Sequence, residues 1–137
     1  AIASSVGITV RALDPSDPKN LNASGWYRPA KNGKSAVIEV DMKGPPVRRS
    51  FTIAHELGHH FLGHGERPRD TTKPFNLYNF DPIDSEANQF AAELLMPADY
   101  VEALIKQKGI TSLARLISLF QVSGAAMEIR LKTLGYV

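Results

Sequence analysis

The chain has 137 residues, of which 43% are hydrophobic and 22% charged, proportions typical of one globular domain and not of a disordered or fibrous chain. The net charge of +2 is too small to indicate nucleic-acid or membrane binding by itself. Because the chain has no cysteine, disulfides, a thiolate nucleophile and sulfur-ligated zinc are excluded, and any metal must be bound by His, Asp or Glu.

The first half of the chain predicts a short sheet followed by a helix. Residues 1–12 alternate β-branched side chains, which indicates an opening strand or short helix before two Asp-Pro turns. Two further runs, Ala23–Arg28 and Ser35–Asp41, are separated by turn residues and suit the strands of a hairpin. After a Gly-Pro-Pro sequence the apolar period changes from two to that of a helix, which predicts a helix over Arg49–Leu62.

The second half predicts a long loop and then only helices. Residues 63–82 show no helical period, and a loop of that length in a small domain is typically functional, so it could cover a cleft. A helix that Asp84 or Ser85 can cap follows and continues to Leu95, because apolar residues recur at helical spacing. Three more helices are expected, over Ala98–Lys108, Thr111–Phe120 and Ser123–Leu134.

The order of these elements, strands first and helices after, indicates an α+β fold with a short, mostly antiparallel sheet. We expect one domain over residues 1–137, with an uncertain N-terminal segment at residues 1–22. In this interpretation residues 23–96 hold the sheet and the two main helices, and residues 97–137 form a helical C-terminal subdomain.

The helix predicted before the long loop contains the pattern H-E-x-x-H at residues 55–59. Residues four apart project from the same face of a helix, so His55 and His59 can bind one cation while Glu56 approaches a water on it. This arrangement predicts a zinc site with Glu56 as the general base of a hydrolase. The position of the pattern on an amphipathic helix favours a zinc site over a chance match.

A catalytic zinc takes three protein ligands and leaves a fourth position to water. His60 and His64 are more simply surface histidines, because their positions on or after the helix do not suit the cation. Carboxylates on the following helix are better candidates, as in the gluzincin arrangement, and there Glu86 and Glu93 compete. Glu86 is the preferred ligand because it lies nearer the buried stripe, where coordination offsets desolvation. Asp84 is more simply an N-cap.

Two blocks of sequence, RSFTIAHELGH at residues 49–59 and EANQFAAELLMP at residues 86–97, together resemble the ImmA/IrrE family of metallo-endopeptidases. Residues 116–135 also look like the closing helical segment of that family. The resemblance implies a zincin-like fold and a Zn²⁺ cofactor. Its ligand and base positions match the set already chosen from the residues, which is His55, His59 and Glu86 as ligands and Glu56 as base.

The resemblance further implies an intracellular peptidase that cleaves a specific repressor of the Xre-like helix-turn-helix type, in a phage, mobile-element, stress or toxin–antitoxin system. The expected partner is therefore a protein substrate, either a repressor or an antitoxin. No apolar run approaches the roughly 20 residues that cross a bilayer, so a cytoplasmic location without membrane contact is expected.

An alternative function keeps the metal but not the cleavage: a regulatory zinc module that binds a repressor or DNA through the helix-turn-helix-like residues 111–134. Residues 97–137 carry five basic and three acidic side chains, which is a weak charge for contacting phosphates. Direct nucleic-acid binding is therefore the less favoured interpretation.

Two further roles stay open from the sequence. A developing oxyanion needs a donor besides the metal, and Tyr78 or His64, in or near the long loop, could supply it. The strand Ser35–Asp41 could form the edge of the cleft and align an extended peptide through backbone hydrogen bonds, or it could be an ordinary core strand.

Overall fold

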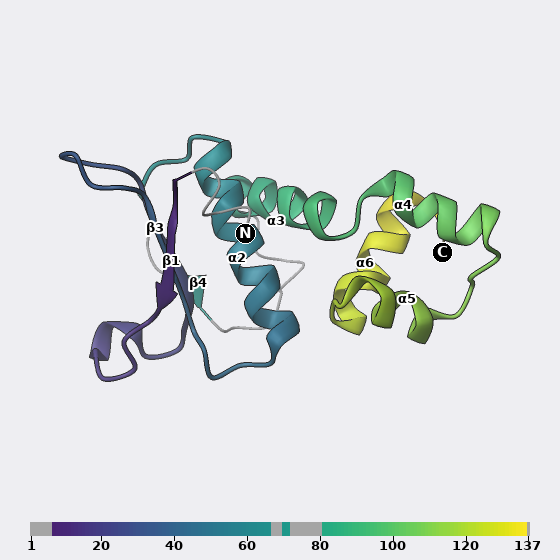
Figure 1. Cartoon of the computed structure of the whole chain (residues 1–137), viewed down its shortest axis with the longest axis horizontal. Helices are drawn as coiled ribbons and strands as arrows, with labels where there is room; N and C mark the ends of the chain where they lie inside the picture. The colour runs from purple at the N-terminus through teal and green to yellow at the C-terminus, as the bar shows by residue number, and fades with distance from the viewer. Residues whose placement is uncertain (1–6, 67–69, 72–80, 137) are drawn as a thin grey trace.

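A small mixed sheet lies at one end of the molecule and a group of short helices at the other, with two longer helices between them (Figure 1). The computed structural model describes residues 7–66, 70–71 and 81–136. Within these residues the sheet has four strands in the order β1-β3-β2-β4, namely β1 (Thr9–Ala12), β2 (Ala23–Arg28), β3 (Val37–Val40) and β4 (Asp70–Thr71). Because β1 pairs with β3 in parallel and the other two pairings are antiparallel, the predicted α+β fold with a mostly antiparallel sheet is confirmed.

The predicted hairpin is present, with β2 at its expected bounds and β3 shorter than expected. Ile38 and Val40 of β3 are buried, while Val37 and Glu39 lie on the opposite face, as the pleat requires. The proposed role of this strand as the edge of a cleft is wrong, because β3 is hydrogen-bonded to β1 on one side and to β2 on the other. Its backbone groups are already used in the sheet.

Helix α2 (Pro46–Phe61) carries the H-E-x-x-H pattern and begins three residues before the predicted start. Proline is favoured at the first position of a helix because its missing N–H would have no partner there, and Pro46 takes that position. Ala54 and Leu57 are buried on this helix, and Leu57 belongs to the core that joins α2 to the sheet.

Helix α3 (Pro82–Leu95) begins earlier than its apolar pattern predicts, again with a proline in its first turn. Its N-cap is Asp81, whose carboxylate accepts a hydrogen bond of 3.0 Å from the backbone N–H of Ile83. The prediction that Asp84 or Ser85 caps this helix is therefore wrong. Both residues lie within the first turn, and their side chains are available for other contacts.

Helices α2 and α3 touch almost backbone to backbone. A Cβ atom placed on Gly58 would lie 3.0 Å from the Cα and 3.1 Å from the carbonyl oxygen of Ala87, closer than ordinary van der Waals contact. Ala87 and Ala91 of α3 are completely buried. Small residues on both helices thus permit an approach that larger side chains would prevent.

Within the described residues, two hydrophobic cores hold the chain together. The first lies between the sheet and α2 and contains Ile8, Tyr27, Ala36, Ile38 and Leu57. The second lies among the C-terminal helices and contains Met96, Val101, Ile110, Leu116, Val122, Met127 and Leu131. Its elements are α4 (Ala98–Glu102), the π-helical turn η2 (Ala103–Gln107), α5 (Leu113–Phe120) and α6 (Gly124–Leu134). None of the helices in the described segments combines the length and the hydropathy of a membrane span.

Arg130 connects the C-terminal helices to α3. Its side chain is only 8% exposed, its Nε donates a 2.9 Å hydrogen bond to the carbonyl oxygen of Met96, and its guanidinium pairs with Glu93. Glu93, the competing ligand candidate, is therefore a partner of Arg130. Since Arg130 is one of the five basic residues of residues 97–137, its burial leaves still less positive charge there for a phosphate backbone.

Replacing Gly58 by valine is expected to destabilise the protein by about 1–3 kcal/mol, the usual cost of overpacking a core. The added side chain would meet the backbone of Ala87, which cannot rotate away. The matched control is Gly124→Val on α6, where a Cβ would meet only the end of the Ile117 side chain, at 3.5 Å. Urea denaturation measures the free energy of unfolding, and equal values for Gly58→Val and the wild type would contradict the close helix contact.

Candidate metal centre

Helix α2 brings its two patterned histidines together as their spacing predicts. The Nε2 atoms of His55 and His59 are 3.1 Å apart, and their rings meet edge to face. Both side chains are buried, and so is Glu56, which is 1% exposed. The two imidazoles, with adjacent Nε2 atoms, and the glutamate that follows His55 in the sequence are therefore all buried on α2.

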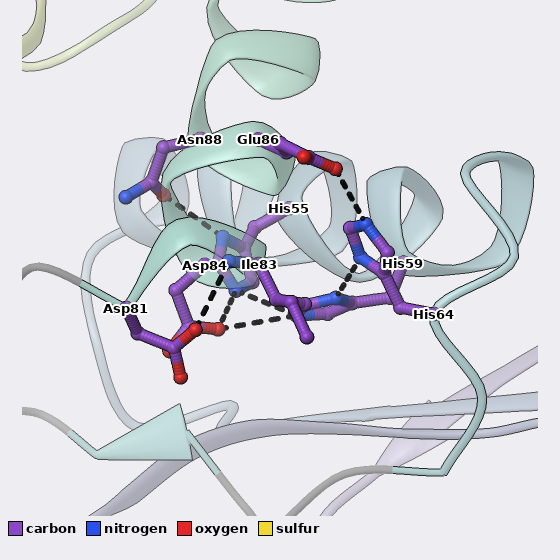
Figure 2. Close-up of polar contacts among 8 residues, drawn as sticks. All are labelled: His55, His59, His64, Asp81, Ile83, Asp84, Glu86 and Asn88. Carbon is purple, nitrogen blue, oxygen red and sulfur yellow. Dashed lines mark hydrogen bonds and ion pairs between the residues drawn. The ribbon is translucent and has the colours of Figure 1, made fainter.

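The carboxylate that completes this group is Asp84 of α3 (Figure 2). Its Oδ1 lies 3.4 Å from Nε2 of His59 and 3.7 Å from Nε2 of His55. Among the residues that the structure describes, these are the His and acidic side chains that could hold a metal ion, with ligand atoms within 4.8 Å of one another.

Glu86, the ligand expected from the sequence, does not join this group in the structure. Its Oε2 lies 2.9 Å from Nε2 of His64 instead. Two residues along a helix correspond to a rotation of about 200°, so Glu86 and Asp84 leave α3 on nearly opposite sides. Asp84 faces the histidines because α3 starts early, at Pro82, and so already has helical geometry at that residue.

The three side chains fit a metal ion. A zinc-sized ion bound at about 2.0–2.2 Å with tetrahedral angles holds its ligand atoms about 3.3–3.6 Å apart, and the three separations in the structure are 3.1, 3.4 and 3.7 Å. Oδ1 of Asp84 is buried and has no hydrogen-bond partner within the described part of the chain. Coordination of a cation would satisfy this oxygen and leave one position open for water, as in catalytic sites.

His55 and His59 each have a polar contact at the other ring nitrogen, Nδ1. Nδ1 of His55 lies 2.8 Å from Oδ1 of Asn88, and because an amide oxygen only accepts, this Nδ1 carries the hydrogen. Asn88 is one turn after Asp84 on α3, so both reach the same face of α2. Nδ1 of His59 lies 2.9 Å from Nδ1 of His64. Such outer contacts fix the tautomer of a metal-binding histidine.

The two other histidines are not the surface residues that the sequence predicts. The side chain of His64 is 8% exposed, with both ring nitrogens in contact with His59 and Glu86, so it has no nitrogen left to donate to an oxyanion. His60 is partly buried, and its Nδ1 lies 2.8 Å from the hydroxyl of Tyr27. The other oxyanion candidate, Tyr78, lies outside the described residues.

Strand β2 passes directly over the general-base candidate. A Cβ on Gly25 would lie 2.4 Å from Cγ2 of Thr52 and 3.4 Å from Oε1 of Glu56, so only glycine permits this approach. Two residues further along the strand, Tyr27 meets His60, which is four residues after Glu56 on the helix. Burial raises the pKa of Tyr27 above its ordinary value of 10, so its hydroxyl stays protonated near neutral pH. The sheet thereby holds this side of α2 in place.

Comparison with known proteins points to one family. The profile of the IrrE N-terminal-like domain of the peptidase M78 family matches residues 3–132. The chain is 37% identical over 99 residues to the uncharacterized immunity region protein 2 of Bacillus phage phi105, an alignment that covers 69% of this chain and 58% of that protein. It is 29% identical over 106 residues to the radiation response metalloprotease IrrE of Deinococcus radiodurans, covering 74% of this chain and 32% of that protein. The matched region thus spans less than two thirds of either relative.

Replacing Asp84 by alanine is expected to weaken zinc binding because it removes a ligand. The loss of affinity should exceed the loss of about 10- to 100-fold that follows when an outer hydrogen-bond partner is removed. Competition with a chromogenic zinc chelator measures the affinity. Asp99→Ala, at an exposed aspartate of α4, is the matched control. If Asp84→Ala bound zinc with wild-type affinity and Glu86→Ala did not bind it, the third ligand would be Glu86, as expected from the sequence.

Proposed function

The chain belongs to the peptidase M78 family of IrrE N-terminal-like domains, and on that basis we propose that it is a zinc-dependent endopeptidase. The observation that supports this most directly is the convergence of His55, His59 and Asp84 on one point, with Glu56 next to His55 on the same helix. Two imidazoles, one carboxylate and an open fourth position are the ligand set of catalytic zinc in several peptidases. A structural zinc site would instead have four protein ligands.

The three metal ligands and Glu56 have different roles in the proposed hydrolysis. Zinc bound at the three ligands would lower the pKa of a coordinated water toward about 7 and polarise the scissile carbonyl. Glu56 would act as the general base: it would accept one proton from the attacking water as the new C–O bond forms and deliver it to the amine nitrogen as the C–N bond breaks. His55 and His59 stay neutral, each with its hydrogen on Nδ1 and its lone pair on Nε2. Burial of Glu56 keeps its carboxylate apart from bulk water.

The proposed substrate is one specific protein, a transcriptional repressor of the Xre-like helix-turn-helix type or an antitoxin. The names of the two relatives support a regulatory setting, since one is an immunity region protein of a phage and the other a radiation response metalloprotease. We place this activity in a phage, mobile-element, stress or toxin–antitoxin system. Direct binding of DNA is not part of the proposal, because Arg130 is committed to Glu93 and Met96.

Replacing Glu56 by glutamine is expected to lower the cleavage rate by about 10²–10⁴-fold, because the amide cannot accept the proton of the water. Zinc affinity should stay at the wild-type value, since Glu56 is not among the three ligands. The zinc-loaded protein is incubated with the repressor encoded by the adjacent gene, and fragments are counted over time by mass spectrometry. Glu128→Gln, at an exposed glutamate of α6, is the matched control.

Equal fragmentation by Glu56→Gln and the wild type would remove Glu56 as the base. A wild-type protein that binds zinc and the repressor without cutting it would favour the non-cleaving regulatory module over the peptidase.

A further inference from the structure

The end of helix α2 bends the chain back so that His64 lies against His59. Gly63 has a φ of 69°, in the left-handed region that glycine adopts without strain. Its N–H donates to the carbonyl oxygen of His60 at 3.2 Å, and the N–H of His64 donates to that of His59 at 3.0 Å. This pair of bonds is the Schellman motif, which places the second residue after the cap beside the third-last helical residue. Gly65, with a φ of 73°, continues the reversal on the other side of His64.

From this position His64 connects His59 to Glu86. Nδ1 of His59 and Nδ1 of His64 are 2.9 Å apart, and Nε2 of His64 lies 2.9 Å from Oε2 of Glu86 (Figure 2). The ring of His64 is 8% exposed, whereas the side chain of Glu86 is 58% exposed. The buried imidazole therefore joins a metal-site histidine to a carboxylate at the surface.

The direction of each hydrogen bond in this series follows from the one before it. An ionised carboxylate only accepts, so Nε2 of His64 carries the hydrogen that points to Glu86. In a neutral imidazole the other nitrogen is then an acceptor, and Nδ1 of His59 must donate to it. This leaves Nε2 of His59 with a lone pair directed at Asp84 and at Nε2 of His55. The series selects the one tautomer of His59 that can bind a metal at this point.

We propose that His64 and Glu86 are positioning residues that hold His59 in the tautomer and orientation needed for zinc binding. The role rests on the zinc site proposed above and gives these two residues a function outside the ligand set. His55 has the corresponding support from Asn88, whose Oδ1 lies directly against its Nδ1. Helix α3 thus supports both histidines, one directly and one through His64.

The first test is the zinc affinity of the full chain, measured by chelator competition. His64→Ala and Glu86→Ala are each expected to bind zinc about 10- to 100-fold more weakly, the usual effect of losing an outer partner. Glu86→Gln should bind within a few-fold of the wild type, because its amide oxygen still accepts the hydrogen bond from His64. Glu128→Ala, on the exposed face of α6, is the control.

The second test determines the tautomer of His59 in the zinc-free protein. Long-range ¹H–¹⁵N NMR of the zinc-free protein should show His59 with its hydrogen on Nδ1 in the wild type and a mixture of both tautomers in His64→Ala. A purely structural role would alter the free energy of unfolding and leave this ratio unchanged. Glu86→Ala, at an exposed side chain, serves the same purpose if His64→Ala does not fold.

Wild-type zinc affinity in either alanine variant, or an unchanged His59 tautomer, would overturn the positioning role. Failure of the proposed peptidase activity would give a different result. A wild-type protein that binds zinc tightly and cleaves nothing would leave the expected affinity and tautomer results unchanged.

Discussion

The whole site depends on the close contact between helices α2 and α3 at Gly58 and Ala87. Because Gly58 has no side chain, the helix that carries both histidines lies against the helix that carries Asp84, Asn88 and Glu86. Asp84 then reaches the Nε2 atoms of both histidines, and Asn88 reaches Nδ1 of His55. Glu86 reaches Nδ1 of His59 through His64. A wider helix separation would loosen all of these contacts at once, since they share one interface.

Burial and coordination are coupled at this interface. Taking carboxylates such as Asp84 and Glu56 out of water costs free energy unless a cation or hydrogen bonds compensate for it. A divalent ion at the proposed site, held by Asp84 and the two imidazoles, would supply that compensation only in the folded chain, where the ligands meet. Metal binding at the proposed site would therefore stabilise the fold. The sheet contributes from the other side, because Gly25 and Tyr27 of β2 hold the face of α2 that carries Glu56.

Part of this arrangement was predictable because it depends on local periodicity. The bounds of β2, the helical nature of the segments around the two sequence blocks and the C-terminal helices all follow from apolar spacing and from Gly and Pro positions. His55, Glu56 and His59 belong to this class, since a four-residue spacing on one helix places two imidazoles together whatever the rest of the chain does. Asp84 and Asn88 have the same four-residue spacing on α3, which places them on one face of that helix but does not say which face meets α2.

What the sequence by itself determined was therefore the pair of histidines, the glutamate beside them, the α+β class and the resemblance to a peptidase family. Only the tertiary structure decided that Asp84 and not Glu86 faces the histidines, that His64 supports His59, and that β3 is enclosed by its neighbours. The physical reason is the same in each case. Contacts between distant segments set the rotational phase of one helix against another, the path of the chain after Gly63 and the order of strands in a sheet. No local pattern encodes them.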